Sequence, residues 1–193
     1  MILLAIDVSM CNMGWCIAEE QPDKELYILA SGTISTGITW RKGERPYGVT
    51  GTTLDIIKRS NKLQKSVQAL IDKYKPDYVC AEVMTGAQSS TTAKAMGVAC
   101  STVGSTDSKL IPISPNDVKR AATGNIKASK KEMCEWALDT YPEIGEWWDL
   151  HKDGSPKHSK QEHEADSMAI ATGCYGKYLT LGEDAVFNLN EEV

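Results

Sequence analysis

Three carboxylates of this sequence lie at positions where an ionisable side chain is unusual. Asp7 ends the apolar run MILLAID, and Glu82 ends the apolar stretch YVCAE. Asp166 precedes the small and apolar residues SMAIATG, which places it on the packed face of an expected helix. His163 stands one helical turn before Asp166 and therefore falls on the same face. These four side chains are the candidates for one polar site.

The chemistry that suits such a group is metal binding. Carboxylates that approach one another without a partner repel, which raises a pKa or destabilises the fold. Hard carboxylate oxygens suit Mg²⁺ or Mn²⁺, and an imidazole is compatible with Mn²⁺. Two such ions, roughly 3.5–4 Å apart, can activate a water molecule and stabilise the leaving oxygen of a phosphodiester. We therefore expect two Mg²⁺ ions, or Mn²⁺, and the predicted metal ligands and catalytic residues are Asp7, Glu82, His163 and Asp166.

Each candidate also has an interpretation that needs no metal. Asp7 could begin an Asp-x-Ser turn, and Glu82 could pair with a lysine. His163 could be a structural histidine. Two further acids, Glu162 and Glu164, are predicted to be solvated residues of a first helical turn, where acidic side chains complement the helix dipole.

The apolar pattern predicts the elements that must position these residues. Strands are expected over 1–8, 13–20, 25–36, 77–83 and 109–113. Helices are expected over 53–74, 89–104 and about 162–179, with a loop over 38–51 and an irregular segment over 146–160. Two more helices have sequence signals at their ends: Ser114 before Pro115 with Gly124 after it, and the capping box Ser129–Glu132.

This order predicts an α/β fold with a mixed five-stranded sheet and helices on both faces. If the first and fourth strands are neighbours, Asp7 and Glu82 lie side by side, and the last helix can add Asp166 and His163. The length of 193 residues predicts a single domain over 1–180, followed by an acidic, loosely held tail over 181–193.

Composition excludes several classes of protein. We expect no membrane span, because no run of about 18 apolar residues occurs. No signal peptide is expected either, since no basic region precedes the first apolar run. The six cysteines stand singly and lack zinc-site spacing, which favours free thiols in the cytoplasm.

Positive charge is concentrated despite a net charge of −5. The stretch 109–131 is rich in lysine and arginine, whereas acids gather at the C-terminus. Such a stretch could bind DNA phosphates, although lysines also solvate helix faces. The predicted DNA-binding residues are Lys119, Arg120, Lys127 and Lys130.

Four motifs, in order and at matching separations, resemble those of the RuvC-type Holliday-junction resolvases of the ribonuclease-H-like superfamily. They are LLAIDVSMCNMGWCIAE, KPDYVCAEVM, SPNDVKRAATGNIKASKKEM and HEADSMAIA. The resemblance implies a ribonuclease-H-like fold, catalytic roles for the four site residues, and DNA-facing roles for Lys119 and Lys130. It also implies a homodimer, paired through the helix 89–104, that nicks four-way DNA junctions symmetrically. A helicase partner is not indicated, and a phage-type member would work in the host cytoplasm.

Three departures from the family pattern leave the substrate open. Ser9 replaces a glycine, Thr85 replaces a common aromatic residue, and 146–160 is an insertion whose Trp147 and Trp148 could stack on bases or pack the loop. Alternatives are a broader branched-DNA nuclease of this superfamily and a non-catalytic junction-binding protein. Actin-like ATPases share the first strand motif but need two such domains and glycine-rich phosphate loops.

Overall fold

The computed structural model describes residues 1–37, 51–83 and 90–189. Most of the loop expected over 38–51 falls outside these residues, and Gly51 already belongs to a helix. Met84 and Thr85 also lie outside them, so the position of the missing aromatic residue is not described. Within the described ranges, no helix has the length and apolarity that a membrane crossing requires.

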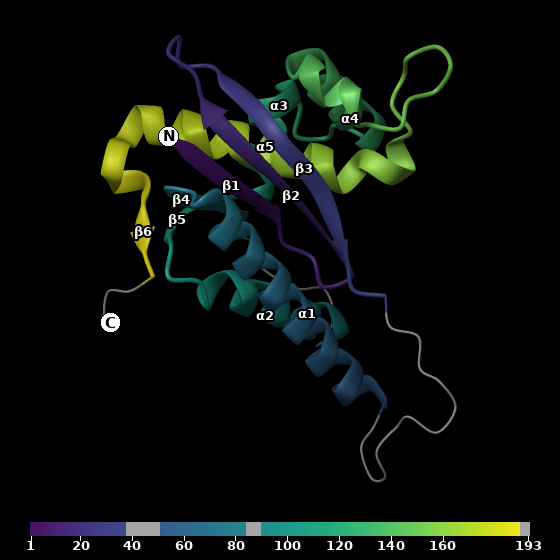
Figure 1. Ribbon diagram of the computed structural model, residues 1–193, viewed down its shortest axis with the longest axis vertical. Coiled ribbons are helices and arrows are strands. Elements are labelled where there is room, and N and C mark those ends of the chain that lie inside the picture. The colour runs from purple at the N-terminus through teal and green to yellow at the C-terminus, as the bar shows by residue number, and fades with distance from the viewer. Residues whose placement is uncertain (38–50, 84–89, 190–193) are drawn as a thin grey trace.

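A mixed sheet of six strands forms the centre of the molecule (Figure 1). The strands are β1 (Ile2–Asp7), β2 (Asn12–Glu20), β3 (Leu26–Ser35), β4 (Tyr78–Glu82), β5 (Lys109–Ile113) and β6 (Phe187–Asn188). Their order across the sheet is β3-β2-β1-β4-β5-β6. The first three strands form an antiparallel meander, and β1 pairs with β4 in parallel. The predicted neighbourhood of the first and fourth strands is therefore confirmed.

Helices cover both faces of this sheet, as predicted (Figure 1). The helices are α1 (Gly51–Tyr74), α2 (Ser90–Gly104), α3 (Pro115–Thr123), α4 (Lys130–Thr140) and α5 (His158–Leu181), with 3-10 turns at Pro142–Glu146 and Gly182–Ala185. Alternate residues of β1 point to opposite layers: Leu4 and Ile6 pack against α1 and α2, whereas Leu3 and Ala5 pack against α3, α4 and α5. Strand β1 is thus buried on both sides, which explains its unbroken apolar run.

The end signals in the sequence correspond to real helix ends. The Ser114 side chain accepts a hydrogen bond from the Asp117 backbone N–H, and Gly124 ends α3 with a left-handed φ of 70°. The capping box between Ser129 and Glu132 is formed in both directions at the start of α4.

Two expectations about the C-terminal part of the chain are wrong. The sheet has six strands and not five, because Phe187–Asn188 pairs with β5. The beginning of the acidic tail is not loose, since the Glu183 carboxylate accepts a 2.7 Å hydrogen bond from the Tyr78 hydroxyl and lies 3.7 Å from the Lys109 ammonium. The packed part of the chain therefore continues past residue 180.

Candidate active site

The two strands that carry Asp7 and Glu82 end side by side. Ile6 of β1 is paired with Ala81 of β4, so the next residue of each strand lies at the same sheet edge. Asp7 has the same parity as Leu3 and Ala5, and Glu82 has the same parity as Cys80, which all belong to the core beneath α5. Both carboxylates are therefore directed to the face that α5 covers.

Helix α5 crosses this edge and adds the other two candidates. His163 Nδ1 lies 3.1 Å from Asp7 Oδ2, and both side chains are largely buried. The helix can approach this closely because Gly14, the β2 partner of Asp7, has no side chain. Asp166, one turn further along α5, is also partly buried. All four residues predicted from the sequence thus gather at one edge of the sheet.

Burial and mutual repulsion keep protons on this cluster. Burial, followed by the charges of Asp7 and Asp166, raises the pKa of Glu82 to about 7 against the opposing charge of Lys119. Burial and the Asp7 charge likewise raise the pKa of Asp166 to about 6. The hydrogen bond to Asp7 raises the pKa of His163 above its ordinary value, although burial opposes this. The metal-free site therefore carries less negative charge near neutral pH than its composition suggests.

The predicted DNA-binding residues separate into two pairs. The charge of Lys119 acts on Glu82, and the charge of Lys130 is close enough to Asp166 and Asp7 for these acids to raise the lysine's pKa. Arg120 instead pairs with Asp117, and Lys127 is exposed on the segment between α3 and α4. Only Lys119 and Lys130 of the four thus border the acidic cluster within the described part of the chain.

The prediction that Glu162 and Glu164 are solvated first-turn acids is wrong. Helix α5 begins at His158, so both residues lie beyond its first turn. The Glu162 side chain is only 19% exposed and contacts the Lys130 ammonium at 2.5 Å and His163 Nε2 at 3.6 Å. The Glu164 carboxylate accepts hydrogen bonds from the Ser31 hydroxyl at 2.5 Å and the Trp148 indole N–H at 3.1 Å.

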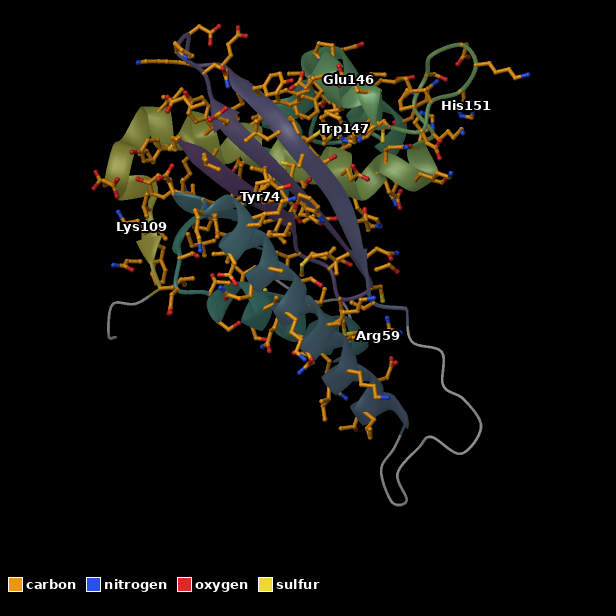
Figure 2. The ribbon with its side chains drawn as sticks, in the orientation of Figure 1. Arg59, Tyr74, Lys109, Glu146, Trp147 and His151 are labelled. Atoms are coloured by element: carbon orange, nitrogen blue, oxygen red, sulfur yellow. The ribbon has the colours of Figure 1, made fainter. Side chains whose placement is uncertain are left out.

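The tryptophan pair of the insertion packs the loop onto the domain. Trp148 is buried, and its indole N–H reaches Glu164 of α5. Trp147 is 42% exposed, yet its indole N–H donates to the Ser31 hydroxyl of β3 at 3.0 Å. In Figure 2, Trp147 lies close to β3, whereas His151 lies out on the loop before α5. Of the two interpretations of this pair, the geometry supports packing.

The donor set suits a hard divalent cation by its chemistry. Carboxylate oxygens and one imidazole are the ligands that Mg²⁺ and Mn²⁺ accept, and the raised pKa values mark a repulsion that a cation would remove. Within the described residues, however, no three His, Cys, Asp or Glu side chains form a ready-made coordination shell. An ion held by these residues would therefore require their side chains to adjust.

Comparison with known proteins gives one consistent family. The family model for the crossover junction endodeoxyribonuclease RuvC matches residues 3–138. A curated RuvC from Prochlorococcus marinus subsp. pastoris is 28% identical over 174 residues, which are 89% of this chain and 94% of the relative. A RuvC from Rickettsia bellii is 26% identical over 178 residues, or 90% of this chain and 96% of the relative.

Solved structures of the same class share the fold. The T. thermophilus RuvC in complex with a Holliday junction substrate superposes with a TM-score of 0.65 at 17% identity and covers 94% of this chain and 96% of its own. The yeast mitochondrial Holliday junction resolvase Ydc2 gives a TM-score of 0.62 at 19% identity, and the match covers 94% of this chain and 81% of Ydc2. This confirms the predicted ribonuclease-H-like fold. Because the family model spans well over half of its residues, the chain belongs to the RuvC family of crossover junction endodeoxyribonucleases.

Proposed function

We propose that this protein resolves four-way DNA junctions by metal-dependent hydrolysis of phosphodiester bonds. The observation that carries the proposal is the meeting of Asp7, Glu82, His163 and Asp166 at one sheet edge, bordered by Lys119 and Lys130. Family membership supports the same reaction class. Each subunit of a homodimer would nick one strand, so that two symmetric nicks separate the junction.

The four clustered side chains would hold two divalent ions, Mg²⁺ or Mn²⁺. When bound, these ions supply an activated water and stabilise the leaving oxygen of the phosphodiester. Glu82 and Asp166, whose pKa values are about 7 and about 6, would have to lose their protons to serve as ligands. His163, which contacts Asp7 through Nδ1 and lies 3.6 Å from Glu162 through Nε2, would supply the imidazole ligand, and Glu162 would help to orient the ring.

The basic residues at the rim would bind the DNA backbone. Lys119 is held in place by donating a 3.0 Å hydrogen bond to the carbonyl oxygen of Ala128, which leaves its charge near Glu82. Lys130 is 69% exposed and can reach a phosphate beside the acidic cluster. Arg120 and Lys127 would contact phosphates further away. Such contacts position DNA without reading its sequence.

The proposed homodimer would use the outer face of α2. Small residues are exposed along this helix at Ala93, Gly97, Cys100 and Gly104, which allows close approach of a second copy. Light scattering of the purified protein tests the dimer. The cytoplasm is the proposed location, where branched DNA intermediates would be available.

A nicking assay tests the reaction. Wild-type protein and the Asp7→Asn variant are incubated with a synthetic four-way junction in Mg²⁺ or Mn²⁺. We expect cleavage at symmetric positions by the wild type and a loss of at least about 100-fold in the variant, as for removal of a catalytic metal ligand. Asp72→Asn is the matched control, because Asp72 is an exposed acid of α1 that pairs with Lys75.

The other outcomes identify the alternatives. Equal cleavage of forks, Y-structures and junctions would favour a broader branched-DNA nuclease. Tight binding without cleavage in either metal would contradict the proposal and favour a junction-binding protein.

A further inference from the structure

The Glu162–Lys130 ion pair links the acidic cluster to the DNA-binding rim. Glu162 Oε2 lies 2.5 Å from Lys130 Nζ, and the other carboxylate oxygen lies 3.6 Å from His163 Nε2. The glutamate side chain is 19% exposed and the lysine side chain is 69% exposed. The carboxylate is therefore fixed inside the rim, whereas the ammonium can leave it for solvent.

The position of Lys130 is unfavourable without such a partner. It is the first residue of α4, where the positive end of the helix dipole repels a cation. The hydrogen bond to Glu162, together with the charges of Glu162, Asp166 and Asp7, raises the pKa of Lys130 above its ordinary value, although burial opposes this. Lys131, the next residue, pairs instead with Glu135 of its own helix at 3.5 Å, away from the cluster. Only Lys130 of these two is bound by an acid from another element.

We propose that the Glu162 carboxylate binds the Lys130 ammonium in the place that a DNA phosphate would take. DNA must displace this carboxylate in order to bind Lys130. The inference rests on the proposed function in assigning DNA to this rim, and it adds a residue that determines how tightly DNA is held. A carboxylate and a phosphate oxygen offer the ammonium the same kind of charge-assisted contact. Binding therefore exchanges one ion pair for another at this lysine.

The exchange has two measurable consequences. The Lys130–phosphate contact is weakened by the free energy of the pair that is broken. In addition, the phosphate that Lys130 neutralises loses a condensed cation, but the freed Glu162 carboxylate attracts a cation in return, so the net contribution of this contact to the salt dependence is small. Glu162→Gln removes the competing charge and keeps the shape of the side chain. It should raise DNA affinity about two- to fivefold at low salt. It should also steepen the plot of log affinity against log salt by about 0.9.

The experiment measures DNA binding by fluorescence anisotropy in EDTA, so that neither metal loading nor cleavage enters the result. The proteins are wild type, Glu162→Gln, Lys130→Ala and the double variant, each titrated with a four-way junction and with an unbranched duplex over a range of salt concentrations. Near-ultraviolet circular dichroism checks that each variant is folded. Glu135→Gln is the matched control, because it releases Lys131 on the same helix but leaves Lys130 paired.

The expected result is a gain in affinity and a steeper salt slope for Glu162→Gln that both disappear when Lys130 is alanine. Two results would overturn the inference. One is an unchanged affinity for Glu162→Gln, and the other is an equal gain with and without Lys130, which would indicate general repulsion of DNA by the carboxylate. Cleavage by the wild type is assayed separately. If the wild type cleaves the junction but Glu162→Gln does not change DNA affinity, only this inference is wrong. If Glu162→Gln raises DNA affinity in a Lys130-dependent way but the wild type does not cleave, only the proposed function is wrong.

Discussion

The backbone of His163 lies directly against Gly14, with no room for a side chain between the two. A Cβ atom on Gly14 would stand 1.9 Å from the His163 carbonyl oxygen and 2.4 Å from its carbonyl carbon. Gly14 is the β2 partner of Asp7, and His163 Nδ1 lies 3.1 Å from Asp7 Oδ2. The absence of a side chain at residue 14 thus sets the distance between α5 and the sheet at the candidate active site.

Gly14→Ala should displace α5 and disturb the site. The methyl group meets backbone atoms, which cannot rotate away, so we expect a loss of about 1–3 kcal/mol in the free energy of unfolding. Urea unfolding measures this loss. Junction cleavage should fall more than the folded fraction does, because His163 and Asp166 move away from Asp7 and Glu82.

Gly176→Ala is the matched control for this prediction. Gly176 lies in α5 itself, and a Cβ there meets no atom within 4 Å. Alanine should stabilise the helix by about 0.5–1 kcal/mol and leave cleavage unchanged. Full activity of folded Gly14→Ala would show that the close approach is not needed.

Metal affinity should rise with pH in the absence of DNA. Glu82 and Asp166 have pKa values of about 7 and about 6, so both hold protons at pH 5.5 and have largely lost them at pH 8. A divalent ion must displace these protons before it can bind. Calorimetric titration with Mn²⁺ at the two pH values should show weaker binding at pH 5.5. Titrations in buffers of different ionisation enthalpy should show proton release near pH 6.5. Equal affinity at both pH values would contradict the assignment of these two ligands.

Glu82 should destabilise the metal-free protein at high pH. The pKa of its carboxyl group is raised on folding from 4.5 to about 7, so the folded state holds this proton more tightly than the unfolded state. Stability therefore falls as pH rises from about 4.5 to 7 and stays low above that range. Glu82→Gln removes the penalty. In EDTA at pH 8 we expect it to be about 1–2 kcal/mol more stable than the wild type, a value that allows for solvent screening of a partly exposed group.

Two further measurements control this comparison. At pH 4 the advantage of Glu82→Gln should disappear, because the wild-type carboxyl group is then mostly protonated in both states. Addition of Mg²⁺ at pH 8 should stabilise the wild type more than the variant, since binding to the folded state alone is stabilising. A variant that is less stable than the wild type in EDTA at pH 8 would show that Glu82 has a favourable partner.

The candidate site residues can be identified from the sequence because each ends or interrupts a strongly patterned element. Asp7 and Glu82 end buried strands, and Asp166 interrupts the packed face of a helix. Their meeting could be predicted only on the condition that β1 and β4 are neighbours, since the pairing of distant strands leaves no mark within either strand. The parallel register of the two strands supplies this missing condition.

The errors have local physical causes. The starts of α3 and α4 are predictable from the sequence because Ser114 and Ser129 cap these helices with side-chain hydrogen bonds. The start of α5 at His158 has no such signal: its cap residue, Lys157, makes no side-chain capping bond. The sequence pattern therefore places the start of this helix near Glu162 and predicts a solvated first turn for Glu162 and Glu164. Strand β6 has only two residues, too few for any periodicity.

Glu164 should contribute to the fold by holding the insertion against the sheet. Its carboxylate accepts from the Ser31 hydroxyl and the Trp148 indole, and Ser31 in turn accepts from Trp147. Glu164→Ala leaves the Trp148 N–H in a buried position without its acceptor, and we expect a loss of about 1–3 kcal/mol in the free energy of unfolding. Urea unfolding of this variant beside Glu146→Ala, which alters an exposed acid of the same region, measures the difference.

The same network predicts the effect of the exposed tryptophan on DNA binding. Trp147 is oriented by its bond to Ser31 and is 42% exposed, so its ring serves mainly to hold the loop down. Trp147→Phe removes the indole N–H but keeps an aromatic face, and Trp147→Ala removes both. We expect both variants to bind a four-way junction within about twofold of the wild type, because stacking on a base would be worth about 1–3 kcal/mol and its loss at least fivefold in affinity. A large loss for Trp147→Ala that Trp147→Phe restores would instead assign this ring to an unpaired base of the junction.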